Sequence, residues 1–131
     1  MSATEHLANL KITILELIDD LRNHIFTRAS EQTDLIIIDL FFKNMKEKDI
    51  MDHCIEHILP RKEEIEKKNI DFFIKNKNSI FNSLPQQRID HFEKMIVTPE
   101  SQGGMSNENR DTMWMYFQTI SRITENYKKK Q

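Results

Sequence analysis

His53, Glu56 and His57 are the residues whose types and spacing come closest to a catalytic site. They form the pattern H-x-x-E-H, the inverted zinc-peptidase signature. Two histidines four positions apart on a helix face one metal ion, and the glutamate between them can activate a bound water. We nevertheless expect no metal, because a catalytic zinc needs a third protein ligand that no downstream motif supplies. A small zinc hydrolase at His53 and His57 is the least favoured function, and the solvent-facing side of an amphipathic helix is the preferred interpretation.

Cys54 is the single cysteine of the chain, so an intramolecular disulfide is excluded and a reducing compartment is favoured. Its apolar neighbours predict a buried, inert thiol, whereas a nucleophile needs a lowered pKa and an oriented base. A phosphate-binding glycine loop is also excluded, because the only two glycines, Gly103 and Gly104, are adjacent. We therefore expect a chain that is not an enzyme and that has no cofactor.

Lysines at the C-terminal end are the residues best suited to contact a nucleic acid. Lys128, Lys129 and Lys130 are consecutive, and phosphate contacts through them would be non-specific and salt-sensitive. Charge runs of this kind are usually solvated surface, and the net charge of −2 gives no general attraction to nucleic acid or membrane. A nucleic-acid-associated protein is therefore the alternative function.

The elements that position these residues are expected to be helices. Only two glycines and three prolines occur in 131 residues, and a many-stranded fold needs a turn residue every few positions. A chain of this length fits one domain with a single hydrophobic core. The sequence therefore predicts an all-α single domain over residues 1–131, a bundle of about five or six helices with proline-marked junctions.

Hydrophobic periodicity predicts the first helix over residues 4–27. Residues 28–33 are polar and are expected to form a loop, with Thr33 or Asp34 capping the next helix. Residues 35–42 are apolar nearly all round, and their β-branched isoleucines would also suit a buried strand. Because no partner strand is visible, we expect a central buried helix and leave the strand open as the alternative.

Prolines mark the later junctions. Pro60 is expected to end a short helix over residues 49–59 and to start another through about residue 76. A polar stretch follows, and Ser83 with Pro85 predicts the start of a helix over residues 84–97.

Residues 99–104 contain both glycines and predict the clearest break and the most mobile loop. Ser106 or Asn107 is then expected to cap a last helix ending at the terminal lysines, and the first and last helices are expected to be the longest.

Trp114 and Tyr116 lie two positions apart and cannot face the same side of the last helix. We expect Trp114 in the core, and Met115 and Tyr116 as candidates for an interface, where exposed tyrosine is typical. The residues expected in the core are Leu10, Ile14, Leu17, Leu21, Ile37, Phe41, Ile58, Phe72, Phe73, Phe92, Trp114, Phe117 and Ile120.

Spaced prolines and aromatic residues give the second half of the chain a family resemblance. They occur in Ile58-Leu59-Pro60-Arg61-Lys62-Glu63-Glu64-Ile65-Glu66, Asp71-Phe72-Phe73, Ser83-Leu84-Pro85 and Asp111-Thr112-Met113-Trp114-Met115-Tyr116-Phe117. These segments resemble small helical proteins encoded by nucleocytoplasmic large DNA viruses, which similarly have a Leu-Pro junction, a Phe-Phe pair and a Trp-x-Tyr helix with a basic tail. The resemblance implies a helical fold and a viral origin, and it carries no functional residue because that family has no assigned activity.

The remaining signals concern location and partners. No stretch approaches the roughly 20 apolar residues of a membrane span, and the N-terminus lacks the basic region of a secretory signal. We therefore expect no membrane association and a cytoplasmic or nuclear location, or the virion or host cytoplasm if the chain is viral. The expected function is a non-enzymatic helical interaction protein that acts through protein–protein contacts or self-association.

Overall fold

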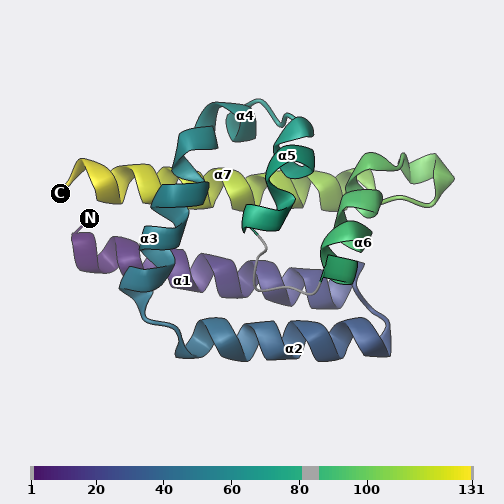
Figure 1. The fold of residues 1–131 in the computed structure, drawn as a ribbon, viewed down its shortest axis with the longest axis horizontal. Helices are drawn as coiled ribbons and strands as arrows, with labels where there is room; N and C mark the ends of the chain where they lie inside the picture. The colour runs from purple at the N-terminus through teal and green to yellow at the C-terminus, as the bar shows by residue number, and fades with distance from the viewer. Residues whose placement is uncertain (1, 81–85, 131) are drawn as a thin grey trace.

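Three long helices form the frame of the fold. In the computed structural model, which describes residues 2–80 and 86–130, α1 (Ala3–Asp20) lies between α7 (Asn107–Lys129) and α2 (Ala29–Asn44) (Figure 1). The shorter helices that cross this frame are α3 (Glu47–His57), α4 (Lys62–Glu66), α5 (Asp71–Ile80) and α6 (Gln86–Val97). No strand occurs within the described ranges, so the predicted all-α class is confirmed and residues 35–42 are helical.

The count and order of helices also agree with the sequence. Among the described residues six helices have at least 10 residues, α4 adds a single turn, and α7 and α1 are the longest. Pro60 lies in the turn between α3 and α4, and Pro99 follows α6, as predicted. Ser83 and Pro85 lie outside the described residues. No helix in the described ranges is long and apolar enough to cross a membrane.

The first helix begins at a capping box. The Ser2 hydroxyl accepts the N–H of Glu5 at 3.2 Å, and the Glu5 carboxylate accepts the N–H of Ser2 at 3.3 Å, so two free donors of the first turn are satisfied. The predicted helix over residues 4–27 continues beyond α1 as a wider π-helical turn, Leu21–Ile25. The Gln32 side chain donates to the carbonyls of Arg22 and Phe26 and so stabilises the end of this turn.

The start of α2 corrects the sequence analysis. The helix begins at Ala29, so the predicted loop over residues 28–33 and the predicted cap at Thr33 or Asp34 are wrong. The backbone N–H of Arg28 donates to the Glu31 carboxylate at 3.1 Å, and Glu31 is almost fully buried. The polar residues of this first turn are therefore helical, and their side chains cap and pack the helix. A pattern of polar residues alone does not distinguish such a turn from a loop.

One hydrophobic core joins the long helices. Of the residues predicted to lie in it, Leu10, Ile14, Leu17, Ile58, Trp114, Phe117 and Ile120 are buried and Leu21 is partly buried. The side chains of Phe72, Phe73 and Phe92 lie outside the described part of the structure. The Tyr116 hydroxyl donates to the Asp20 carboxylate and ties α7 to the end of α1.

The prediction of one continuous helix from Pro60 to about residue 76 is wrong. This segment is divided into α4 and α5, and Lys68 between them has a left-handed backbone with φ of 55°. Its N–H donates to the carbonyl of Ile65 at 3.1 Å and that of Asn69 to Glu64 at 2.9 Å, the pattern of a Schellman motif. This ending usually has glycine at the left-handed position, and the lysine here gives no such signal. The predicted polar stretch after Asn76 is instead helical as far as Ile80.

The connection from α6 to α7 interrupts the helices, as predicted, and hydrogen bonds hold it to the end of α6. The Met105 N–H donates to the Met95 carbonyl at 2.9 Å, and Met105 is buried. Ser106 caps α7, as predicted, since its hydroxyl accepts a hydrogen bond from the N–H of Asn109. Gly104 packs so tightly that a Cβ atom there would lie 1.9 Å from the Thr98 carbonyl oxygen.

Replacing Gly104 by Ala is expected to destabilise the fold by about 2–3 kcal/mol, because a backbone carbonyl must move to admit the methyl group. Gly103→Ala is the matched control. It has open space around its Cβ position but a φ of 87°, and should lose only about 1 kcal/mol. Urea unfolding measures both, and equal losses would contradict the steric account.

Replacing Trp114 by Ala is expected to cost about 3–5 kcal/mol, because its buried ring contributes to the core between α1 and α7. The neighbouring Met115 is 54% exposed, so Met115→Ala should change the unfolding free energy by no more than about 0.5 kcal/mol. Thermal or urea unfolding compares the two variants, and a small loss for Trp114→Ala would contradict its placement in the core.

Candidate functional site

The outer side of α2 carries the most prominent group of exposed apolar side chains on any one described helix. Ile36, Ile37, Leu40 and Phe41 are 43%, 61%, 53% and 47% exposed. We call these four residues the α2 apolar face. The predictions that Ile37 and Phe41 lie in the core, and that this helix is central and buried, are wrong. In Figure 1, α2 lies at the edge of the molecule, so its outer side faces away from α1.

Helix geometry explains why this face is continuous. Residues three and four positions apart share one side of a helix, so Ile36 lies beside Leu40, and Ile37 beside both Leu40 and Phe41. Leu35 and Ile38 point to the opposite side and are buried in the core. An apolar segment that covers the whole circumference can bury only the side that has a neighbour.

Charge is sparse on the outer side of α2, where Asp34 is half-buried. Among its exposed residues with a described side chain, Lys43 is the only charged one, and its Nζ lies 2.7 Å from the Asp39 carboxylate. Asp39 is itself buried. A helix face that merely meets water usually carries charged residues, so the composition of this face is typical of a surface that another apolar surface covers.

The polar residues at the two ends of the α2 apolar face bond within their own helix. The Thr33 hydroxyl donates to the Ala29 carbonyl at 3.2 Å, and the Asn44 amide donates to the Leu40 carbonyl at 2.9 Å. Covering this surface would therefore leave few unsatisfied donors, and its desolvation would cost little.

Both ends of α2 are fixed to the rest of the fold. Near its start, the His91 Nε2 of α6 lies 3.1 Å from the Glu31 carboxylate. At its end, the Lys11 Nζ of α1 donates to the carbonyls of Lys43 and Met45 at 2.7 and 3.0 Å, where a cation suits the helix dipole. The α2 apolar face is thus presented on an anchored helix.

The predicted interface pair on α7 divides between surface and interior. Met115 is exposed, as an interface residue must be, whereas Tyr116 is half-buried with its hydroxyl bonded to Asp20. Burial, together with this bond, raises the pKa of the Tyr116 hydroxyl. Helix α1 separates α7 from α2 in Figure 1, so the structure does not bring Met115 and Tyr116 to the α2 apolar face.

The terminal lysines lie at the end of α7 and are exposed. The Lys129 Nζ lies 3.0 Å from the Glu125 carboxylate, and the same carboxylate pairs with Lys62 of α4. Part of the positive charge available for a phosphate backbone is therefore compensated within the protein.

The H-x-x-E-H residues lie on one side of α3, as helix spacing requires. The ring centroids of His53 and His57 are 4.6 Å apart, and His57 Nε2 lies 3.7 Å from a Glu56 oxygen. In the described part of the chain, no three His, Cys, Asp or Glu side chains are grouped so that they could hold a metal ion. The arrangement supplies two imidazoles with one carboxylate beside them. Among the residues that the structure describes, no further group completes a metal site with them.

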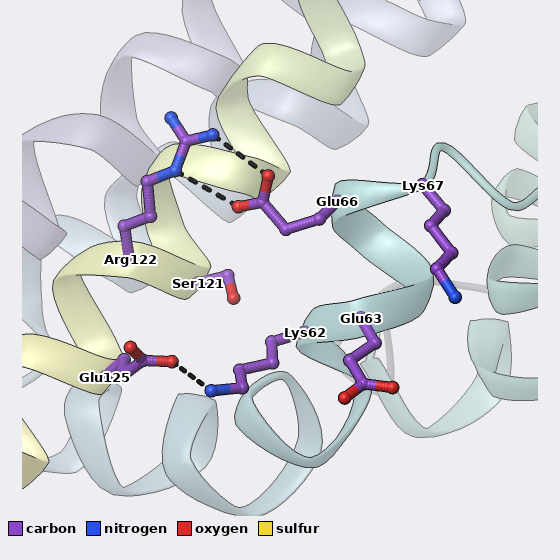
Figure 2. A pocket seen from close by; sticks show the side chains of 7 residues that line it. All are labelled: Lys62, Glu63, Glu66, Lys67, Ser121, Arg122 and Glu125. Atoms are coloured by element: carbon purple, nitrogen blue, oxygen red, sulfur yellow. Dashed lines mark hydrogen bonds and ion pairs between the residues drawn. The ribbon is translucent and has the colours of Figure 1, made fainter.

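A charged hollow between α4 and α7 is the feature that the sequence analysis missed. It is an open depression of about 670 Å³, lined by Lys62, Glu63, Glu66, Lys67, Ser121, Arg122 and Glu125 (Figure 2). Arg122 donates two bonds to the Glu66 carboxylate, at 3.1 and 3.0 Å, and Lys62 donates to Glu125.

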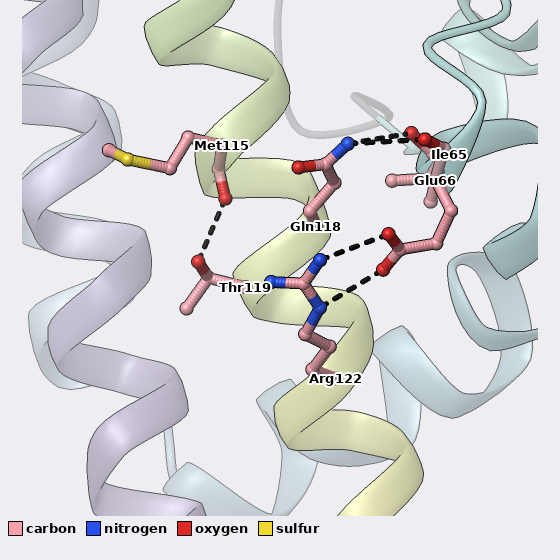
Figure 3. A network of polar contacts seen from close by, with 6 residues as sticks. All are labelled: Ile65, Glu66, Met115, Gln118, Thr119 and Arg122. Carbon is pink, nitrogen blue, oxygen red and sulfur yellow. Dashed lines mark hydrogen bonds and ion pairs between the residues drawn. The ribbon is translucent and has the colours of Figure 1, made fainter.

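The side chains around this hollow join α4 to α7. Gln118 donates to the carbonyls of Ile65 and Glu66, each at 3.4 Å, where α4 ends (Figure 3). The three cations and three carboxylates of its lining balance, so it offers no net charge to an ionic substrate. Its charged groups are far apart in sequence, and no spacing pattern could have paired them.

Cys54 is buried, and burial raises the pKa of its thiol to about 12, although a hydrogen bond with Thr124 opposes the rise. The thiol is therefore protonated at neutral pH and lacks the thiolate that nucleophilic chemistry requires. We expect native protein to react with a thiol reagent at pH 8 at least a hundredfold more slowly than protein unfolded in guanidinium. Comparable rates in the two states would show that Cys54 is accessible.

Compared with known proteins, the chain matches no family model, no curated protein and no solved structure. Its function must therefore be inferred from the geometry of its own residues.

Proposed function

We propose that this chain is a non-enzymatic helical interaction protein whose α2 apolar face binds another protein. The observation that carries the proposal is the exposure of Ile36, Ile37, Leu40 and Phe41 on one side of an anchored helix. Soluble proteins seldom leave large contiguous apolar patches uncovered unless the patch binds something.

The energetics favour a contact of moderate strength. Fully burying one side chain of this size contributes about 1.5–3 kcal/mol, so covering the half that is still exposed contributes about 1 kcal/mol for each of the four. Association itself costs several kcal/mol in lost freedom, so these side chains supply the centre of an interface that surrounding contacts must complete.

Two further expectations belong to this proposal. The resemblance to small proteins of large DNA viruses favours a viral origin, with the virion or host cytoplasm as the location, and otherwise the cytoplasm or nucleus. The nucleic-acid alternative has weaker support, because Lys129 already pairs with Glu125 and the net charge of the chain is −2.

The test places a photo-crosslinking amino acid at position 37, or at position 115 as the control, in the protein expressed in its native cells. Protein adducts should form at least fivefold more at position 37, and Leu40→Glu should abolish them. Position 115 is similarly exposed and was itself predicted to lie at an interface. Adducts at position 115 and none at position 37 would move the interface to α7 and contradict this proposal.

A further inference from the structure

We infer that the partner of the α2 apolar face is a second copy of this chain, bound as an antiparallel pair of α2 helices. The inference rests on the proposed function and names its partner. It follows from the shape, symmetry and charge of α2, each considered below.

The shape of the surface suits another helix. α2 has 16 residues and is about 24 Å long, and its outer side is convex. A convex helix surface packs best against another helix, whose side-chain ridges enter its grooves. Because α2 lies at the edge of the fold (Figure 1), a second helix can approach along its length.

The order of residues along α2 makes the face complementary to itself. In an antiparallel pair centred between Ile38 and Asp39, Ile37 of one copy lies level with Leu40 of the second copy, and Thr33 with Asn44. Apolar positions therefore meet apolar positions, and the polar ends meet polar ends. A twofold interface requires this kind of self-complementarity, and the antiparallel direction also opposes the two helix dipoles favourably.

The distribution of charge favours a second copy over a membrane surface. Lys43 is the one exposed charge among the described side chains of α2, and Asp39 pairs with it, so two copies bring no uncompensated like charges together. Helices that lie on membranes carry several basic residues on their polar face to bind anionic lipid. On α2 a single basic residue, Lys43, lies beside Ile36 and Leu40, and it is paired with Asp39.

The size of the surface sets the strength of the pair. One helix packed on one helix buries less than the 1,200–2,000 Å² typical of stable interfaces, so the dimer should be weak and depend on concentration. We expect half-dimerisation of the purified chain at roughly 10–100 µM.

Sedimentation of the purified 131-residue chain from about 1 to 500 µM tests the inference directly. The wild-type mass should rise from monomer to dimer, and Ile37→Glu with Leu40→Glu should weaken the dimer at least tenfold. Val97→Glu with Met115→Glu is the matched control, because Val97 and Met115 are similarly exposed on α6 and α7, and it should dimerise like wild type. Circular dichroism verifies that both variants keep their helices.

Disulfide trapping tests the antiparallel direction. When Thr33→Cys and Asn44→Cys chains are mixed and oxidised, the mixed dimer should form at least fivefold more than either homodimer. Wild-type chain should give no disulfide dimer, because Cys54 is buried. A predominance of the Thr33→Cys homodimer would indicate parallel helices and overturn the antiparallel pair.

The two proposals fail in different ways. A wild-type chain that stays monomeric at about 500 µM, or a dimer unaffected by the two glutamates on α2, overturns pairing through this face. If position 37 still forms adducts with other proteins in cells, the proposed function stands with a different partner. If it forms none, the proposed function fails as well.

Discussion

The antiparallel packing of α1 against α7 is the interaction on which the other elements depend. Leu10, Ile14 and Leu17 of α1 share one core with Trp114, Phe117 and Ile120 of α7, and Tyr116 bonds to Asp20 across the pair. Helix α3 crosses both, α4 is bonded to α7, and α2 takes another side of α1. Helix α2 therefore packs against this frame with one side, and its outer side remains exposed. The exposure of its isoleucines follows from that position.

Elements with a periodic stripe and a side-chain cap were predictable from the sequence. Helix α7 is capped by the predicted Ser106, and α1 carries the stripe of Leu10, Ile14 and Leu17 that the spacing indicated. The errors lie where local pattern and tertiary structure separate. The break at Lys68 uses a left-handed residue that is not glycine, and the first turn of α2 is polar because Glu31 is needed there for capping. Neither fact is encoded in hydrophobic periodicity.

The candidate site shows the same division. The sequence located the most apolar segment and the exposed Met115, but composition does not reveal how many neighbours a helix will have. A usable signal was present, because Thr33, Ile36, Ile37, Leu40 and Asn44 place no charge on one side of a helix. By contrast, Lys62, Glu66 and Arg122 are plainly charged in sequence, and only the fold shows that they are used to join α4 to α7. The side of the molecule that is proposed to bind is thus distinguished by exposed apolar surface and not by charge.

The bond between Tyr116 and Asp20 joins residues 96 positions apart and has a kinetic consequence. Helical bundles usually fold quickly because most of their contacts are local, whereas closing a long loop delays the contacts that stabilise it. During synthesis, α1 and α2 leave the ribosome with their inner sides uncovered until α7 follows. Chaperones would meet this chain as an apolar hairpin of helices, and the rate at which α7 docks would decide how much of it reaches the folded state.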